Sequence, residues 1–230
     1  MIIDTHCHFD MMPNPEAYIS AKEIAGDIVI GMTHLPSHFQ IGQPHLRGYK
    51  RIRLALGMHP LLAAGNRGEL SLFKQLVDQT TYIGEIGLDF SREGKGTESE
   101  QKQVLREILT VLKGKNKIIS VHSRRAEKEL LTHLKEFDIK NVIFHWYSGS
   151  VELIPEILAR GYYFSINEAM CRSNNGRAII EKIPRERVLT ETDAPYNERN
   201  QIKEVLSCIK ISEEEVCKNF RTLLNRVIKS

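Results

Sequence analysis

Short runs of apolar and β-branched residues alternate with longer amphipathic segments along the 230 residues of the chain. This alternation is typical of repeated βα units, in which each strand of a parallel sheet is followed by a helix that covers it. Eight such units favour an α/β fold of the (β/α)8 TIM-barrel type, with residues 1–230 forming a single domain. The predicted strands lie near residues 2–5, 27–33, 52–57, 82–84, 117–122, 141–145, 162–165 and 188–190.

Helix signals lie between these strands. Thr97 and Glu100 have the spacing of a capping box, and they begin a predicted helix that ends near Lys113. Residues 36–48 contain several Gly and Pro residues and are expected to be mostly loop. Further helices are predicted at 125–137, at 150–160 and after a second capping box at Ser212 and Glu215.

Composition excludes several classes of protein. Apolar residues make up 41% of the chain and charged residues 27%, and no stretch approaches the roughly 20 apolar residues of a membrane span. Asp4, His6 and His8 interrupt the N-terminus, so it lacks the apolar run of a signal peptide, and we expect a cytoplasmic protein without membrane contact.

The four cysteines form no Cys-x-x-Cys pair, which predicts reduced thiols. A net charge of +3 suits a polyanionic substrate but not a protein that coats nucleic acid.

Two histidines follow the first predicted strand closely, in Asp4-Thr5-His6-Cys7-His8. Positions i and i+2 of a strand share a face, so His6 and His8 should stand side by side while Cys7 points away. Two imidazoles fixed on one strand lose little freedom on binding a cation, and neutral imidazole suits Zn, Mn, Co, Ni and Fe(II). The pair therefore predicts part of a metal site, although two ordinary histidines would have the same spacing.

Further side chains of ligand type follow later strands. In a barrel, functional side chains lie at the C-terminal ends of the strands and in the loops just after them. Together with the first pair, these residues place five of the nine histidines and two carboxylates on one rim, which predicts a metal centre there. The later residues are His59, Glu85, His122, His145 and Asp193.

Six motifs, in this order, resemble those of TatD-type metal-dependent hydrolases, a nuclease branch of the amidohydrolase-like barrels. They are Asp-x-His-x-His at 4–8, Gly-x-His-Pro at 57–60, Gly-Glu-x-Gly-Leu-Asp at 84–89, His-x-Arg at 122–124, a histidine before an aromatic stretch and Ser-Gly at 145–149, and Glu-Thr-Asp-Ala-Pro-Tyr at 191–196. The resemblance implies a centre of two divalent metal ions, which would be Zn, Mn or Mg. The metal ligands that it implies are His6, His8 and Asp193 on one ion, His122 and His145 on the other, and Glu85 as the bridge.

The resemblance also implies hydrolysis of phosphodiester bonds in DNA. Two cations about 4 Å apart would supply a nucleophile at neutral pH and offset the charge that builds on phosphorus. We count Glu85 as catalytic because its loss would disturb both ions, and Asp193 is the candidate base, with a purely ligating role as the alternative. His59 matches the family's active-site histidine and would donate to a phosphate or leaving oxygen, or orient a ligand.

Substrate contacts are expected from the rim. Arg124 offers a planar fork to phosphate oxygens, unless it pairs with a neighbouring acid such as Asp89. Trp146 and Tyr147 are predicted to stack on a base. A stiff duplex is too wide to lower an internal phosphate between rim loops, whereas an unpaired end can thread in. The predicted partner is therefore single-stranded DNA, cut from its ends.

Several loops depart from the family pattern, and these leave other functions open. The segment 33–57 is shorter than is usual in the family and carries three additional histidines. The loops at 167–176 and 197–201 also differ from the family pattern. Since rim loops select substrates in barrels, the bond broken could instead be an aminoacyl ester on a charged tRNA. A scaffold with a vestigial site is a third reading, which the complete ligand set disfavours. The altered rim also resembles the nuclease component of some bacterial anti-phage systems, which would imply protein partners in a defence complex.

Overall fold

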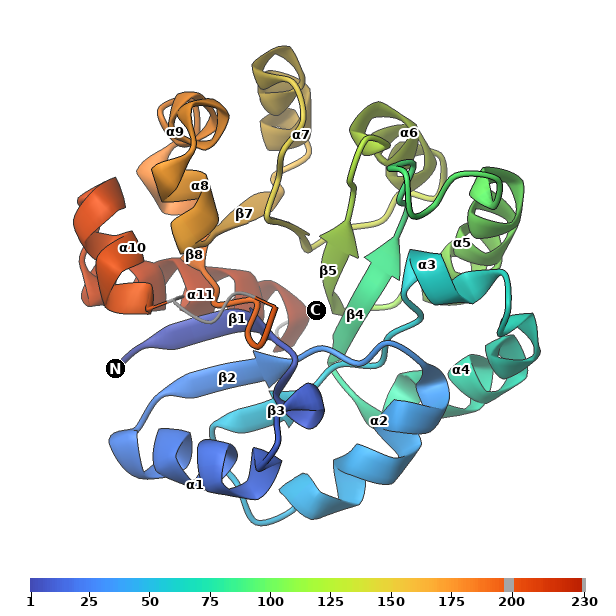
Figure 1. The fold of residues 1–230 in the computed structure, drawn as a ribbon, viewed down its shortest axis with the longest axis horizontal. Coiled ribbons are helices and arrows are strands. Elements are labelled where there is room, and N and C mark those ends of the chain that lie inside the picture. Colours follow the sequence, from blue (N-terminus) through green and yellow to red (C-terminus); the bar gives the residue numbers. More distant parts are fainter. Residues whose placement is uncertain (197–200, 229–230) are drawn as a thin grey trace.

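Eight parallel strands form a barrel within residues 1–196 and 201–228, the part of the chain that this computed structural model describes. Helices surround the strands on the outside (Figure 1). The strands are β1 (Ile3–Cys7), β2 (Ile28–Gly31), β3 (Ile52–Leu54), β4 (Tyr82–Gly87), β5 (Ile118–His122), β6 (Val142–His145), β7 (Tyr163–Ile166) and β8 (Val188–Thr190). The predicted α/β barrel is therefore confirmed. Residues 197–200, most of one loop expected to differ from the family, lie outside the described residues.

The helices lie between successive strands and after the last one, and their apolar faces pack against the barrel. None of the described helices has the length and apolar character that crossing a membrane requires. The helices are α1 (Pro15–Ala25), α2 (Pro36–Gly42), α3 (Pro60–Ala63), α4 (Leu70–Leu76), α5 (Glu98–Leu112), α6 (Glu127–Glu136), α7 (Ile154–Ala159), α8 (Glu168–Arg172), α9 (Asn174–Ile180), α10 (Ile202–Ile209) and α11 (Glu213–Ile228).

The segment after β2 differs from the prediction. Residues 36–48 were expected to be mostly loop, but Pro36–Gly42 form α2, and a 3-10 turn follows at Gln43–Leu46. Pro36 lies in the first helical turn, where its missing N–H is not needed. Phe39 is fully buried and packs the helix against the core. The prediction was wrong because proline here begins a helix instead of interrupting one.

One of the two predicted capping boxes is present. Ser212 Oγ accepts from the Glu215 N–H at 3.2 Å, and the Glu215 carboxylate accepts from the Ser212 N–H at 2.9 Å. Thr97 does precede α5, but its hydroxyl donates to Gly94 O at 3.0 Å and does not cap the helix. The helix start was predicted correctly at Thr97, but the capping interaction was not.

The barrel consists of two hydrogen-bonded blocks, β1-β2-β3 and β4-β5-β6-β7-β8. Between β3 and β4, the Leu56 N–H donates to Tyr82 O, and Leu56 O accepts from the Gly84 N–H. Between β8 and β1, the Asp193 N–H donates to His6 O at 2.9 Å. This second seam holds the first and last of the predicted metal ligands, His6 and Asp193, side by side, although they are 187 positions apart in the sequence.

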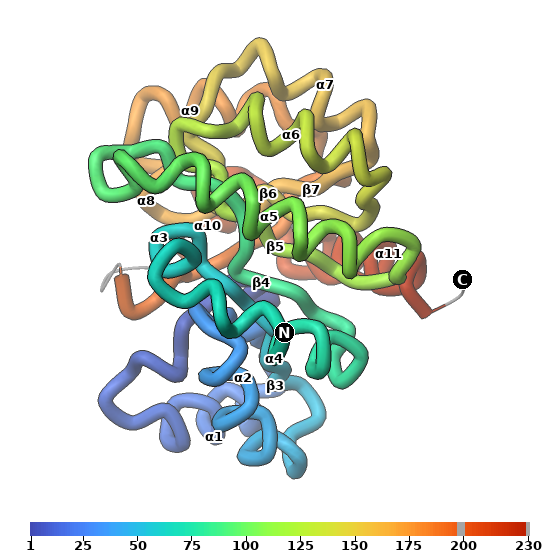
Figure 2. The backbone as a smooth tube through the Cα atoms, turned by 90° about the vertical axis from the view of Figure 1, so that its right-hand side faces the viewer, coloured from blue at the N-terminus to red at the C-terminus, as the bar shows by residue number. Residues whose placement is uncertain are grey.

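The inside of the barrel is filled by side chains. A void of only about 10 Å³ remains among residues of β1, β2, β4, β5 and β6. Phe220 of α11 also lines this void, so α11 covers one end of the barrel. Figure 2 shows α11 on the opposite side of the molecule from α3 and α8, which flank the other end. Because the interior is packed and α11 covers one end, the open end of the barrel is the one where the C-terminal ends of the strands lie.

Candidate metal centre

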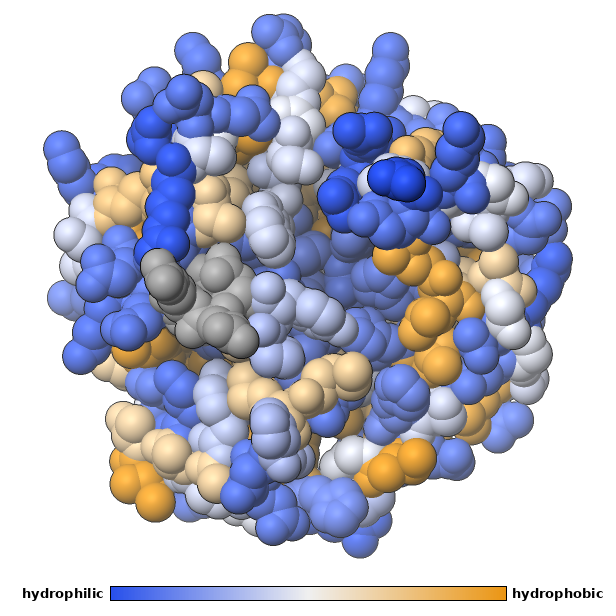
Figure 3. All heavy atoms as spheres, viewed as in Figure 1, coloured by the Kyte–Doolittle hydropathy of each residue, from blue (hydrophilic) through white to orange (hydrophobic). Residues whose placement is uncertain are grey.

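A cavity of about 660 Å³ opens at the C-terminal ends of the strands. Figure 3 shows it as a hollow near the centre of this face, with hydrophobic residues on the α3 side and mainly hydrophilic residues around the rest. Leu61 and Leu62 supply that hydrophobic side. His6 is fully buried beside the cavity, next to His8. The other predicted site residues that line the cavity are His8, His59, Glu85, His122, Arg124, His145, Trp146 and Asp193.

Glu85 lies inside β4, because this strand runs to Gly87 and not only to the predicted end at residue 84. Glycines allow the neighbouring backbones to pack closely here. A Cβ at Gly57 would collide with Thr33 O, and one at Gly87, where φ is +146°, would collide with His122 O. The Gly-x-His-Pro and Gly-Glu-x-Gly motifs therefore bring the strands that carry the site close together.

Four donor atoms, one of them Glu85 Oε2, lie close together on one side of the Glu85 carboxylate. The Nε2 atoms of His6 and His8 lie 3.2 Å apart, and Asp193 Oδ1 lies 3.7 and 3.5 Å from them, respectively. Glu85 Oε2 lies 3.7 Å from His6 Nε2 and 3.5 Å from His8 Nε2. Ligands held tetrahedrally about 2.1 Å from one cation are about 3.4 Å from one another. Each imidazole nitrogen is therefore at ligand spacing from the other three atoms, and His6, His8 and Asp193 form a set close enough to hold one ion.

Three donor atoms meet on the other side of the same carboxylate. Glu85 Oε1 lies 2.6 Å from His122 Nδ1 and 2.8 Å from His145 Nε2, and the two nitrogens are 3.5 Å apart. The contacts to Glu85 are hydrogen-bond distances, shorter than the spacing of ligands around one cation. This second group contains the right donors, but it must open slightly to hold an ion.

The charge of Glu85 suits a metal ligand. Its side chain is almost fully buried. Burial alone would raise the pKa of Glu85, but the facing histidines outweigh burial and hold this pKa well below its ordinary value. The carboxylate is therefore ionised at neutral pH, with one oxygen toward each group of imidazoles. Imidazole nitrogens and carboxylate oxygens are the donors that borderline divalent ions prefer, so the residues fit such ions.

Polar residues that sequence reasoning did not assign orient the histidine rings. Ser120 Oγ lies 2.8 Å from His6 Nδ1, and Asp89 Oδ2 lies 2.7 Å from His122 Nε2. Partners of this kind fix the orientation of a metal-binding ring and tune its basicity. Asp89 belongs to the Gly-Glu-x-Gly-Leu-Asp motif, which was the one sequence signal for it.

His59 points its outer nitrogen into the cavity. Its Nδ1 accepts from the Leu61 N–H at 3.2 Å, so the ring proton lies on Nε2, which is 3.5 Å from Glu85 Oε2. Burial lowers the pKa of His59 to about 3, and the ring is therefore neutral at pH 7. His34, one of the three additional histidines in residues 33–57, also lines the cavity, and its ring centre lies 5.2 Å from that of His59.

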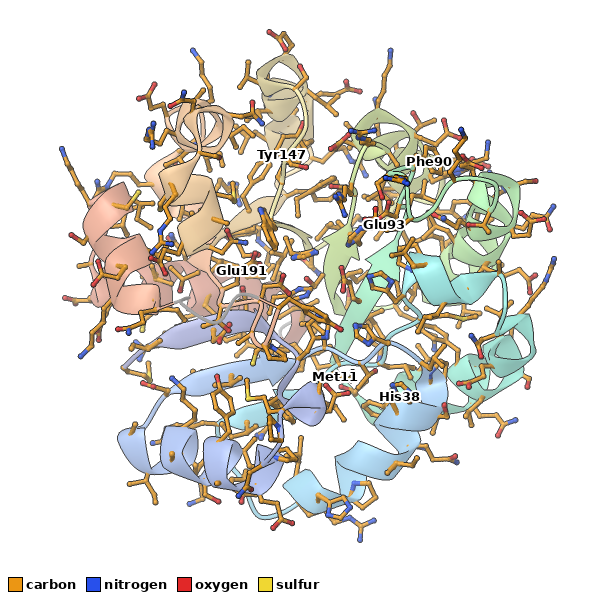
Figure 4. All side chains as sticks on the ribbon, viewed as in Figure 1. Met11, His38, Phe90, Glu93, Tyr147 and Glu191 are labelled. Atoms are coloured by element: carbon orange, nitrogen blue, oxygen red, sulfur yellow. The ribbon has the colours of Figure 1, made fainter. Side chains whose placement is uncertain are left out.

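The predicted substrate contacts divide into two groups. Arg124 and Trp146 line the cavity, and Arg124 Nη1 pairs with Glu93 Oε2 at 3.5 Å and not with Asp89. Tyr147 is fully buried, and its hydroxyl donates to Ser150 O at 2.8 Å. Figure 4 shows Tyr147 displaced from the centre of the barrel toward α7. The structure therefore contradicts the expectation that Tyr147 stacks on a base, because its ring is already packed in the core.

Comparison with known proteins agrees with this arrangement. A family model described as TatD related DNase matches residues 3–225. The chain belongs to the TatD family. An uncharacterized metal-dependent hydrolase of Methanocaldococcus jannaschii is 30% identical over 230 residues, covering 93% of this chain and 90% of its own. Human Deoxyribonuclease TATDN3 is 27% identical, covering 94% of this chain and 86% of its own. The crystal structure of the TatD homologue YjjV from Escherichia coli covers 100% of this chain and 98% of its own, with a TM-score of 0.84 and 24% identity.

Membership of the TatD family establishes the class of enzyme, a metal-dependent hydrolase. It confirms the family resemblance that the sequence motifs indicated. Among the described residues, the sets of His, Asp and Glu side chains close enough to hold a metal ion all lie at the cavity, and three of the four sets include Glu85. Because the chain belongs to a family of metal-dependent hydrolases, this cluster of donors is the candidate metal centre.

Proposed function

We propose that this protein is a metal-dependent deoxyribonuclease that removes nucleotides from the ends of single-stranded DNA. The observation that carries the proposal is the position of Glu85, whose two oxygens face separate groups of imidazoles. Such a carboxylate suits two divalent ions held side by side, and when bound these supply a nucleophile at neutral pH and offset charge at phosphorus. The human relative is named a deoxyribonuclease, which supports DNA as the substrate.

The proposed centre divides the ligands between the two sides of Glu85. One ion would be held on the Oε2 side and the other on the Oε1 side, with Zn, Mn or Mg as the candidates. The separations described above support this division. The proposed ligands are His6, His8 and Asp193 on the Oε2 side, His122 and His145 on the Oε1 side, and Glu85 on both.

Other residues act on the substrate directly. His59 is a neutral donor whose Nε2–H faces the cavity, so it can bind a phosphate oxygen or the leaving oxygen. Asp193 is the proposed proton acceptor because its carboxylate lines the same cavity. Arg124 is about half exposed at the rim, and its guanidinium can exchange Glu93 for a phosphate. These roles require an unpaired phosphodiester to enter the cavity.

The preference for an end follows from the shape of the site. The ligands lie at the base of a cavity bounded by rim loops, and Trp146 forms part of its wall. A free terminal nucleotide can enter this cavity and stack its base on Trp146, whereas paired bases remain stacked in the duplex. Cleavage should therefore proceed stepwise from an end of a single strand.

The decisive assay compares end-labelled linear single-stranded DNA, blunt duplex DNA, closed single-stranded circles and a charged tRNA, each with Mn²⁺ or Mg²⁺. We expect stepwise shortening of the linear strand, slow action on the duplex and intact circles, with His6→Ala inactive. Rapid cutting of the circles would show that the protein is an endonuclease and not an exonuclease. Inertness on all DNA, together with metal-dependent deacylation of the tRNA, would assign the site to ester hydrolysis instead.

Protein partners are not part of this proposal. None of the relatives reported above is described as a component of a defence complex. The expectation of an anti-phage assembly, which came from the altered rim loops, therefore has no support from these comparisons.

A further inference from the structure

We propose that Glu191 is a positioning residue that holds both the ring of His145 and the backbone of Trp146. It would thereby link one metal position to the aromatic wall of the cavity. The inference rests on the proposed metal centre, and it adds a carboxylate that lies outside the ligand set.

Glu191 is fully buried directly after β8. Figure 4 shows it on the inner side of the barrel, close to the strands that carry the site. Its Oε1 accepts from the Asn167 side-chain amide at 2.9 Å, and its Oε2 accepts from the Ser165 hydroxyl. Because burial of a carboxylate is costly, such a residue is held only where several donors satisfy it. These donors fix its position at the ends of β7 and β8.

The ring of His145 lies between two carboxylates. Its Nε2 is 2.8 Å from Glu85 Oε1, and its Nδ1 is 3.6 Å from Glu191 Oε1. Within the described residues, His145 Nδ1 is buried without a hydrogen-bond partner. When Nε2 binds a cation, Nδ1 carries the ring proton, and a small rotation brings this proton to Glu191. A carboxylate behind a metal-binding histidine orients the ring and raises its basicity.

The same oxygen of Glu191, Oε1, also accepts a hydrogen bond from Trp146, the residue that follows His145. The Trp146 N–H donates to Glu191 Oε1 at 3.0 Å. Trp146 has a φ of +36°, a conformation that a bulky residue rarely adopts unless its surroundings hold it there. Because one oxygen meets both residues, a shift of His145 on metal binding should also shift Trp146, whose side chain lines the cavity.

Fluorescence can test this link because Trp146 is the single tryptophan in the sequence. Metal-free protein is titrated with Zn²⁺, and calorimetry is recorded beside tryptophan emission. In Glu191→Gln, which keeps the size but removes the charge, the Kd of the ion on the His145 side should rise about 10–100-fold. The midpoint of the emission change should move by the same factor, while the Kd of the other ion stays as in the wild type.

The matched control is Glu168→Gln. Glu168 is also a buried glutamate on the rim, but it pairs with Arg172, and its replacement should move neither midpoint. Unchanged Kd values in Glu191→Gln, an equal loss at both ions, or an emission midpoint that stays in place would overturn the proposal. If Glu191→Gln does not fold, Glu191→Asp, which keeps the charge but shortens the reach, must weaken the same ion selectively. Wild-type protein that binds fewer than two ions would refute the metal centre itself and not the role of Glu191.

Discussion

Glu85 Oε1 and His122 Nδ1 lie 2.6 Å apart, a hydrogen-bond distance, whereas Glu85 Oε2 stands at ligand spacing from the opposite imidazoles. One side of the centre is thus preformed, while the other must open. We therefore predict that two divalent ions bind metal-free protein in two steps of different affinity. In calorimetry with Zn²⁺, His8→Ala should lose the tighter step and His145→Ala the weaker one. If His145→Ala, and not His8→Ala, lost the tighter step, the prediction of which side binds more tightly would be wrong.

Removing Glu85 should be more damaging than removing His59. Glu85→Ala takes a ligand from both proposed ions, so turnover should fall below detection. His59→Ala removes a hydrogen-bond donor near the substrate and should lower kcat about 10²–10⁴-fold while both ions stay bound. Activity on end-labelled single strands and metal content are measured on the same preparations. Equal residual activity in the two variants would contradict the bridging role.

Trp146 should contribute to binding of the terminal base. Stacking is worth about 1–3 kcal/mol per base, so Trp146→Ala should raise KM for single-stranded DNA about 5–150-fold and change hydrolysis of bis(p-nitrophenyl) phosphate little. Tyr147→Phe is the control, because the Tyr147 ring is buried and only its hydroxyl is lost. A KM for DNA that is unchanged in Trp146→Ala would exclude stacking on this side chain.

The capping box at the start of α11 should make stability depend on pH. The Ser212 N–H and the Arg185 guanidinium lower the pKa of Glu215 from 4.5 to about 2. Because the folded state depresses this pKa, the ionised carboxylate stabilises the fold above pH 4.5, and the contribution is lost as pH falls from 4.5 toward 2.

Urea midpoints of wild type and Glu215→Gln measure this contribution. The variant should unfold at lower urea at pH 7, and the difference from wild type should shrink below pH 4.5. The control is Glu214→Gln, the same change at the preceding position. Its urea midpoint should match that of the wild type both at pH 7 and below pH 4.5. A difference for Glu215→Gln that persists unchanged at acid pH would show that charge is not the cause.

Much of the site could be predicted because its parts follow simple rules of chain geometry. His6 and His8 meet because alternate positions share a face, and Cys7 turns away, with its Sγ 3.6 Å from the Tyr18 hydroxyl. The later histidines reach the same rim because parallel strands in a barrel all end on one side. Those rules need only the order of residues along the chain.

The remaining parts depend on contacts between distant segments. Ser120 and Glu191 were not given roles, because a serine inside a strand or a glutamate just after one does not reveal which ring from another strand it will meet. Tyr147 was misplaced for a related reason. Trp146 and Tyr147 are adjacent aromatic residues, and only the packed barrel determines which one faces the cavity and which one fills the core.

The central claim is that two cations share Glu85. Crystals of the protein grown with Mn²⁺ would test it through anomalous diffraction, which locates the ions independently of the protein coordinates. We predict two peaks about 4 Å apart, one on each side of the Glu85 carboxylate, with His8 beside one and His145 beside the other. A single peak, or two peaks of which one does not contact Glu85, would contradict the claim.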